Sequence, residues 1–139
     1  MLTGLKAYGA AMAAFLLLDG LWLGWIARDF YADRLQSFMT GPVNWPVAGL
    51  FYAIYVLGIV YLVSLPAARA DSGYAGGWRS AFLRGGVLGV IAYGTYDLTN
   101  LATLPGWPSD VVIVDMIWGA AVTAAVACAG CLAADGYRN

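Results

Sequence analysis

The chain has 139 residues, of which 62% are hydrophobic and 11% are charged, and its mean hydropathy is +0.74. Soluble domains are about 45–50% apolar and about a quarter charged, so this composition indicates a one-domain integral membrane protein. The net charge of −1, with no basic block, argues against a nucleic-acid partner. The absence of histidine argues against a His-ligated metal or haem and against a Ser-His-Asp triad, and we expect no cofactor and no metal.

The first predicted element is a membrane-spanning helix at residues 5–27. Its apolar run is longer than the hydrophobic region of a signal peptide, and no cleavage site with a polar mature sequence follows it. We therefore expect this helix to stay attached. It contains Asp19, and Trp22 lies on the same predicted face.

Residues 28–40 are predicted to form a short helix in the membrane interface. Apolar residues recur there at helical spacing and charged residues fill most of the other positions, which is typical of an amphipathic helix. Gly41 and Pro42 are expected to end it. The favoured interpretation is an ordinary amphipathic connector, and the alternative is a lid over an acidic site. The apolar positions are Phe30, Tyr31, Leu35, Phe38 and Met39.

Three more apolar runs predict membrane-spanning helices at residues 43–65, 78–104 and 111–134. The predicted fold is therefore an all-α bundle of four transmembrane helices, in which frequent Gly and Ala residues let the backbones approach closely. Tyr52 and Tyr55 share a face of the second helix and can supply hydroxyl groups. In the fourth helix, Cys128 and Cys131 are most simply packing residues, and a thiol oxidoreductase is the alternative interpretation.

The positions of Lys and Arg predict the orientation of these helices. Five of them fall on the side of the two termini and two on the side of residues 28–40, so both termini are expected in the cytoplasm. Trp25, Trp45 and Trp107 are expected to form an aromatic belt at the outer boundary, and Trp78 marks the inner one.

Three acids fall within the predicted spans, at similar depth in the outer half of the membrane. At about 1.5 Å per residue, Asp19, Asp97 and Asp115 lie roughly 12, 10 and 7–8 Å from the nearer helix ends. No Lys or Arg is expected at that depth, so the three acids cannot all stay ionised without a cation or water. Ionisable groups in a membrane point to function, and the alternative is that protonated acids hydrogen-bond neighbouring helices and hold the bundle together.

The candidate residues for ligand binding or proton handling gather around these acids. Tyr93, Asp97 and Asn100 are spaced as one stripe of the third helix, and Asp115 and Trp118 share a face of the fourth. Neutral amide and hydroxyl groups are the hydrogen-bond partners available to the acids. The full set is Asp19, Asp97, Asp115, Asn100, Tyr93, Tyr96, Thr95, Trp22 and Trp118.

Three segments carry a resemblance to a known family: Gly94-Thr-Tyr-Asp-Leu-Thr-Asn-Leu-Ala-Thr-Leu, Gly106-Trp-Pro and Val114-Asp-Met-Ile-Trp-Gly. With them the chain resembles a bacterial family of small, uncharacterised four-helix integral membrane proteins, and the resemblance covers essentially the whole chain. It implies a multi-pass protein of the bacterial inner membrane. The family has no established activity, so no catalytic residue is carried over.

Three functions fit these features. The first is an acidic and aromatic intramembrane cleft that binds a polar or cationic ligand or a lipid headgroup, with a protonatable acid coupling binding to transport. The second is a membrane-embedded enzyme that modifies a lipid or isoprenoid by Asp acid–base chemistry. The third is an accessory subunit of a larger membrane complex. Membrane lipids are the expected partners throughout, and a homo-oligomer is expected under the first and third functions.

Overall fold

The computed structural model describes residues 2–70 and 76–135, and every regular element within them is a helix. The all-α prediction is therefore confirmed for this part of the chain. In chain order the elements are α1 (Leu2–Leu21), the π-helix η1 (Trp22–Ile26), α2 (Arg28–Leu35), α3 (Trp45–Ile59), the π-helix η2 (Val60–Ser64), α4 (Leu65–Arg69), α5 (Gly77–Thr103) and α6 (Ser109–Asp135).

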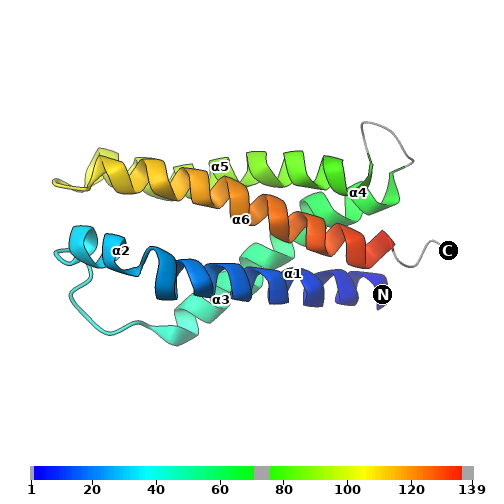
Figure 1. The fold of residues 1–139 in the computed structure, drawn as a ribbon, viewed down its shortest axis with the longest axis horizontal. Coiled ribbons are helices and arrows are strands. Elements are labelled where there is room, and N and C mark those ends of the chain that lie inside the picture. The colour runs from blue at the N-terminus through cyan, green and yellow to red at the C-terminus, as the bar shows by residue number, and fades with distance from the viewer. Residues whose placement is uncertain (1, 71–75, 136–139) are drawn as a thin grey trace.

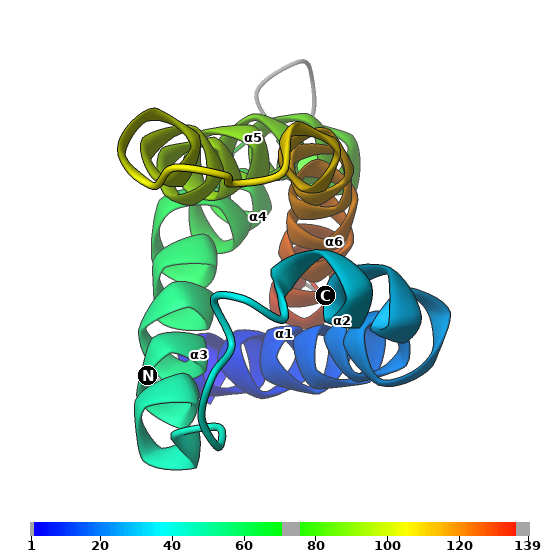
Figure 2. The same cartoon turned by 90° about the vertical axis from the view of Figure 1, so that its left-hand side faces the viewer.

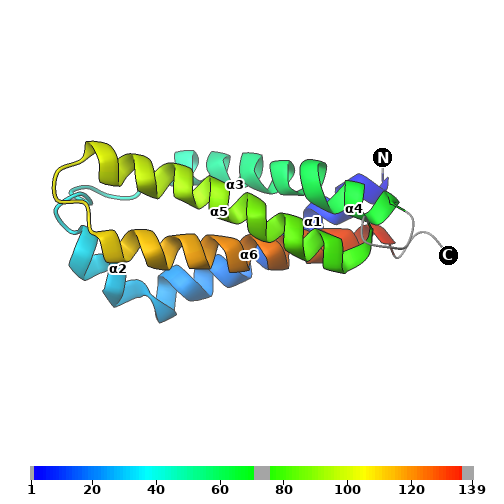
Figure 3. The same cartoon turned by 90° about the horizontal axis from the view of Figure 1, so that it is seen from above.

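Within the described residues these elements form four long rods that run side by side (Figure 1). One rod is α1 with η1, a second is α3 with η2 and α4, and the other two are α5 and α6. Figure 2 looks along the rods and shows α6 between α1 and α5, with α3 and α4 on the opposite side. The two ends of the chain lie at one end of the bundle and α2 lies at the other (Figure 3).

Three rods in the described part of the chain are long and apolar enough to cross a membrane: Leu2–Ile26, Trp45–Arg69 and Ser109–Ala134. α5 is equally long, with 27 residues, but it is more polar and does not meet the same criterion. The structure therefore confirms a helical protein with three membrane-crossing candidates, and the predicted count of four spans is not confirmed.

The second predicted span was expected to end at Leu65, but the helical rod continues through Pro66 to Arg69. The π-helix η2 comes directly before, where the Leu65 N–H bonds to the Val60 carbonyl. Pro66 then falls in the first turn of α4, a position where a missing N–H costs no helical hydrogen bond. At the other end the rod begins at Trp45, with Pro46 in its first turn, where proline is favoured.

α2 is shorter than the interfacial helix predicted at residues 28–40, since it ends at Leu35. Ala27 separates it from η1 with a φ of −108° and a ψ of 7°. Beyond α2 the N–H groups of Phe38 and Met39 both bond back to the Leu35 carbonyl at 2.9 Å, which forms a turn. Met39 is exposed, so no tertiary packing extends the helix further.

α5 and α6 make the most extensive helix–helix contact in the described structure. A Cβ added at Gly89 would lie 2.1 Å from the carbonyl oxygen of Gly119, and one added at Gly85 would lie 2.7 Å from the Ala127 Cβ. Only glycine fits at these two positions. Small residues thus set the distance between the helices, as the sequence predicts.

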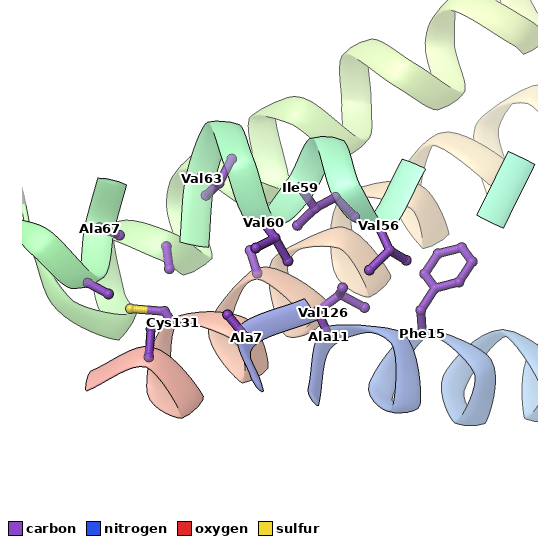
Figure 4. Close-up of a cluster of buried hydrophobic side chains, with 14 of the residues drawn as sticks. Ala7, Ala11, Phe15, Val56, Ile59, Val60, Val63, Ala67, Val126 and Cys131 are labelled. Atoms are coloured by element: carbon purple, nitrogen blue, oxygen red, sulfur yellow. The ribbon is translucent and has the colours of Figure 1, made fainter. Parts of the chain in front are cut away.

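The main apolar core packs between α1, the second rod and α6 (Figure 4). Its members include Ala7, Ala11 and Phe15 of α1, Val56, Ile59, Val60 and Val63 of the second rod, and Val126 and Cys131 of α6. A second, smaller cluster at the α2 end of the bundle consists of Ala27, Tyr31 and Val111. The acids of α1, α5 and α6 lie at the level between these two clusters.

Trp107 departs from the predicted aromatic belt because it is only 7% exposed. The rings of Phe38 and Tyr96 cover it, with centroids 5.0 and 5.9 Å away. Trp25 and Trp45 are 80% and 73% exposed, as residues of a belt are expected to be.

Cys128 and Cys131 are not joined by a disulfide bond. Cys131 is fully buried in the main core, whereas Cys128 is half-buried and donates a hydrogen bond to the Trp78 carbonyl at 3.3 Å. These positions suit packing residues, and the oxidoreductase interpretation stays an untested alternative.

Candidate functional site

The candidate site is centred on Asp97 of α5 and Asp115 of α6, which lie close enough for their carboxyl groups to interact. Asp97 is fully buried, and neither of its oxygens has a hydrogen-bond partner of ordinary geometry. Buried polar groups nearly always have partners, so an orphaned carboxyl points to a proton or a ligand that completes the site.

Asp115 is half-buried and accepts a hydrogen bond from the Tyr31 hydroxyl of α2. The same hydroxyl accepts a hydrogen bond from Trp22 Nε1 of η1 at 3.1 Å. Burial raises the pKa of the Tyr31 phenol, and the hydrogen bond to Asp115 raises that pKa further. The hydroxyl therefore keeps its proton at physiological pH and remains a donor to Asp115.

Asp19 of α1 is buried beside this pair, but its oxygens are both satisfied. Tyr52 of α3 donates its hydroxyl to Oδ2 at 2.8 Å, and Trp118 of α6 donates Nε1 to Oδ1 at 3.3 Å. Asp19 also lies close enough to Asp115 for the two side chains to interact. The three acids predicted from the sequence are thus brought together, with Asp97 and Asp115 as the closer pair.

Two tryptophans connect the surroundings of Asp19 to those of Asp115. The rings of Trp22 and Trp118 stack with centroids 4.4 Å apart and an interplanar angle of 5°. Each of the two stacked rings donates a hydrogen bond: Trp118 donates to Asp19, and Trp22 donates to Tyr31. The result is one connected group of aromatic and acidic side chains that spans α1, η1, α2, α3 and α6.

Tyr93 lies in the same group. Its ring covers Gly119, where an added Cβ would lie 2.2 Å from the ring, and its hydroxyl is near enough to Asp19 and Asp115 to feel their charges. Tyr55 lies beside it with ring centroids 6.4 Å apart, and the Tyr55 hydroxyl hydrogen-bonds to Thr123 at 2.8 Å.

The remaining three candidates lie at the edge of the site or outside it. Tyr96 is 58% exposed and its hydroxyl interacts with the half-buried Asn100. Thr95 is exposed and donates its hydroxyl to the Ile91 carbonyl of its own helix at 2.6 Å, so the structure does not bring it to the acids.

Positive charge is missing from the immediate surroundings of the acid pair. Among the described residues, the groups that interact electrostatically with Asp97 and Asp115 are acids and tyrosines, and none is Lys or Arg. Arg34 instead pairs with Asp110 at the exposed surface. No group of three or more potential metal ligands occurs in residues 2–70 and 76–135.

Tyr31 is the functional candidate that sequence reasoning did not select. Its place on the apolar side of the predicted interfacial helix is visible in the sequence, but that pattern assigns it to the lipid boundary rather than to a carboxyl group. Tyr52 was recognised as a hydroxyl source, and the structure supplies its partner, Asp19. The fold-back of α2 onto α6 is what gives Tyr31 its partner.

A family model described as "Predicted membrane protein (DUF2177)" matches residues 4–132. This match confirms the resemblance to an uncharacterised family of membrane proteins. No curated protein and no solved structure matches the chain.

Proposed function

The chain belongs to the family of predicted membrane proteins described as DUF2177, and we propose that it is a four-span protein whose Asp97–Asp115 pair binds a proton or a cationic ligand inside the membrane. The single observation that carries this proposal is the fully buried Asp97 carboxyl, which faces a second acid and accepts no hydrogen bond from an N–H or hydroxyl group of the described residues.

The fourth span in this proposal is α5. Its 27 residues extend about 40 Å at 1.5 Å per residue, which exceeds the roughly 30 Å of a bilayer's hydrocarbon core. Its contact with α6, itself a candidate span, supports a parallel course through the bilayer. Its exposed residues include six large apolar side chains that suit contact with lipid tails: Leu83, Val87, Val90, Ile91, Leu98 and Leu101.

Lys and Arg positions support the orientation that goes with this span count. Both termini lie in the cytoplasm, the membrane is the bacterial inner membrane, and α2 lies in the outer interface. The acid pair then sits in the outer half of the bilayer, with membrane lipids around the bundle.

The charge balance of the site supports a cation as its ligand. Two carboxyl groups that interact in apolar surroundings cannot both stay ionised without a compensating charge, because burying an unpaired charge is expensive. Such a pair retains one proton between its two members, or exchanges it for a cationic group. Tyr31 donates to Asp115 and thereby stabilises the ionised form of that member.

An apolar carbodiimide, dicyclohexylcarbodiimide, tests this proposal because it reacts with protonated carboxyl groups in apolar surroundings. We expect mass spectrometry of the purified protein in detergent to find the label on Asp97 or Asp115, and to find less of it as the pH rises. Asp97→Asn should remove most of the label. Asp110→Asn is the matched control, since Asp110 is exposed and paired with Arg34. Absence of label from both buried acids would contradict the proposal.

A further inference from the structure

α2 is attached to the rest of the described structure at an inner and an outer point, both on the first two turns of α6. At the inner point Tyr31, 9% exposed, donates its hydroxyl to Asp115. At the outer point Arg34 pairs with Asp110, and both of those side chains are exposed. α2 therefore lies across the end of the bundle that is nearer to the acid pair (Figure 1).

The inner attachment closes the site on that side. Tyr31 packs with Ala27 and Val111 in the smaller apolar cluster, and the ring of Phe30 meets its ring at 5.3 Å edge to face. The Tyr31 hydroxyl lies between Trp22 Nε1 and Asp115. The Tyr31 hydroxyl thus occupies a hydrogen-bonding position of the Asp115 carboxyl on the side of α2.

Both connections of α2 suit an element that moves as a unit. On its N-terminal side the chain leaves α1 through the π-helix η1 and the non-helical Ala27, and π-helical turns are frequent at functional sites. On its C-terminal side residues 39–44 form no helix and are all exposed. Neither connection is a regular α-helix, so a movement of α2 would not have to break α-helical hydrogen bonds in its connections.

We propose that α2 is a gate between the aqueous phase and the acid pair, and that the Tyr31 hydroxyl is its latch. The gate rests on the proposed function, because it controls access to the Asp97–Asp115 site. A cation that binds Asp115 from this side takes the place of the Tyr31 hydrogen bond. Site occupancy and the position of α2 are thereby coupled, since the ligand favours the state in which the latch is released.

Two carbodiimides distinguish the gate from the site behind it. The water-soluble reagent 1-ethyl-3-(3-dimethylaminopropyl)carbodiimide reaches the acids from the aqueous side, whereas dicyclohexylcarbodiimide reaches them from the apolar side. For each variant we measure how much of Asp97 and Asp115 each reagent labels. We then divide the amount labelled by the water-soluble reagent by the amount labelled by the apolar reagent. That ratio cancels changes in the reactivity of the acids themselves.

We expect Tyr31→Phe to raise this ratio about tenfold, because it removes a hydrogen bond to a charged group and keeps the ring that fills the apolar cluster. Tyr61→Phe is the matched control, since Tyr61 is 71% exposed, and it should leave the ratio unchanged. Arg34→Ala should change it far less than Tyr31→Phe, because exposed ion pairs contribute little.

A second variant keeps the test decisive if Tyr31→Phe folds poorly. Trp22→Phe retains a ring against Trp118 but removes the donor that orients the Tyr31 hydroxyl, so the ratio should rise in the same direction. An unchanged ratio in folded Tyr31→Phe or Trp22→Phe protein, with apolar label present, overturns the gate and leaves the proposed function standing. An Arg34→Ala effect as large as that of Tyr31→Phe overturns the assignment of the latch. Lack of apolar label on both acids in the unmodified protein overturns the proposed function, and the gate with it.

Discussion

The three buried acids differ in the side chains that hold them. Asp19 accepts a hydrogen bond at each oxygen from residues of two other rods, Tyr52 and Trp118. Asp115 accepts one from Tyr31, and Asp97 accepts none. The interpretation of these acids as groups that hold helices together therefore fits Asp19, whereas Asp97 and Asp115 have the unfilled capacity that a ligand needs.

Exchange of Asp19 for Asn should destabilise the fold more than the same exchange at Asp97. An amide at position 19 offers one acceptor oxygen, so its NH2 group must face either the Trp118 donor or the Tyr52 hydroxyl. We expect a loss of about 1–3 kcal/mol from the free energy of unfolding. At position 97 the Asn side chain can donate its NH2 group to the neighbouring Asp115 carboxyl, so Asp97→Asn should cost less. Thermal unfolding in detergent measures both, and a larger loss for Asp97→Asn would contradict these assignments.

For individual residues, the sequence predicts the depth of the three acids better than it predicts their hydrogen-bond partners. Helical rise and periodicity suffice to bring Asp19, Asp97 and Asp115 to one level, because both follow from backbone geometry alone. The Tyr31–Asp115 contact depends on how α2 folds back over α6, which no local pattern encodes. The Thr95 hydroxyl bonds the Ile91 carbonyl one turn earlier, as helical Thr hydroxyls commonly do, and so does not reach the acids.

At the scale of the helices, the length of each apolar run determines which segments can cross a membrane. Three of the rods are long and apolar enough to cross a membrane, because the length needed to cross a bilayer is a strong constraint. The sequence predicts neither the π-helices η1 and η2 nor the early end of α2. α5 is long enough to cross a membrane but is less apolar than the other rods. Its small residues allow its close contact with α6, and its many small and polar residues lower its hydropathy.

Gly89 offers a direct test of that helix contact. We expect Gly89→Ala to destabilise the protein by about 1–3 kcal/mol, because its Cβ would meet the Gly119 carbonyl and force α5 away from α6. Gly58→Ala is the matched control, since a Cβ at that position meets nothing within 4 Å. The control should be neutral or slightly stabilising, because Ala is the better helix former. Equal unfolding midpoints for the two variants in detergent would show that the close approach does not stabilise the fold.

Across the whole molecule, the acid level lies between two apolar clusters. The main core occupies the end that holds the termini, and the Ala27–Tyr31–Val111 cluster occupies the end covered by α2. The acids thus occupy a polar layer with apolar packing on both sides, and the described structure supplies no Lys or Arg to neutralise the pair. This layering explains why a protein with so few charged residues retains acids in the middle of its helices.

Infrared spectroscopy of the protonated carboxyl C=O stretch tests the central claim most directly. In purified protein at neutral pH, without an added organic cation, the account predicts a band from a protonated carboxyl group. That band should disappear in Asp97→Asn and persist in Asp110→Asn, while the amide bands of the same spectra verify that each variant remains helical. No such band in the unmodified protein, or a band that Asp97→Asn leaves unchanged, would contradict the claim that this pair holds a proton.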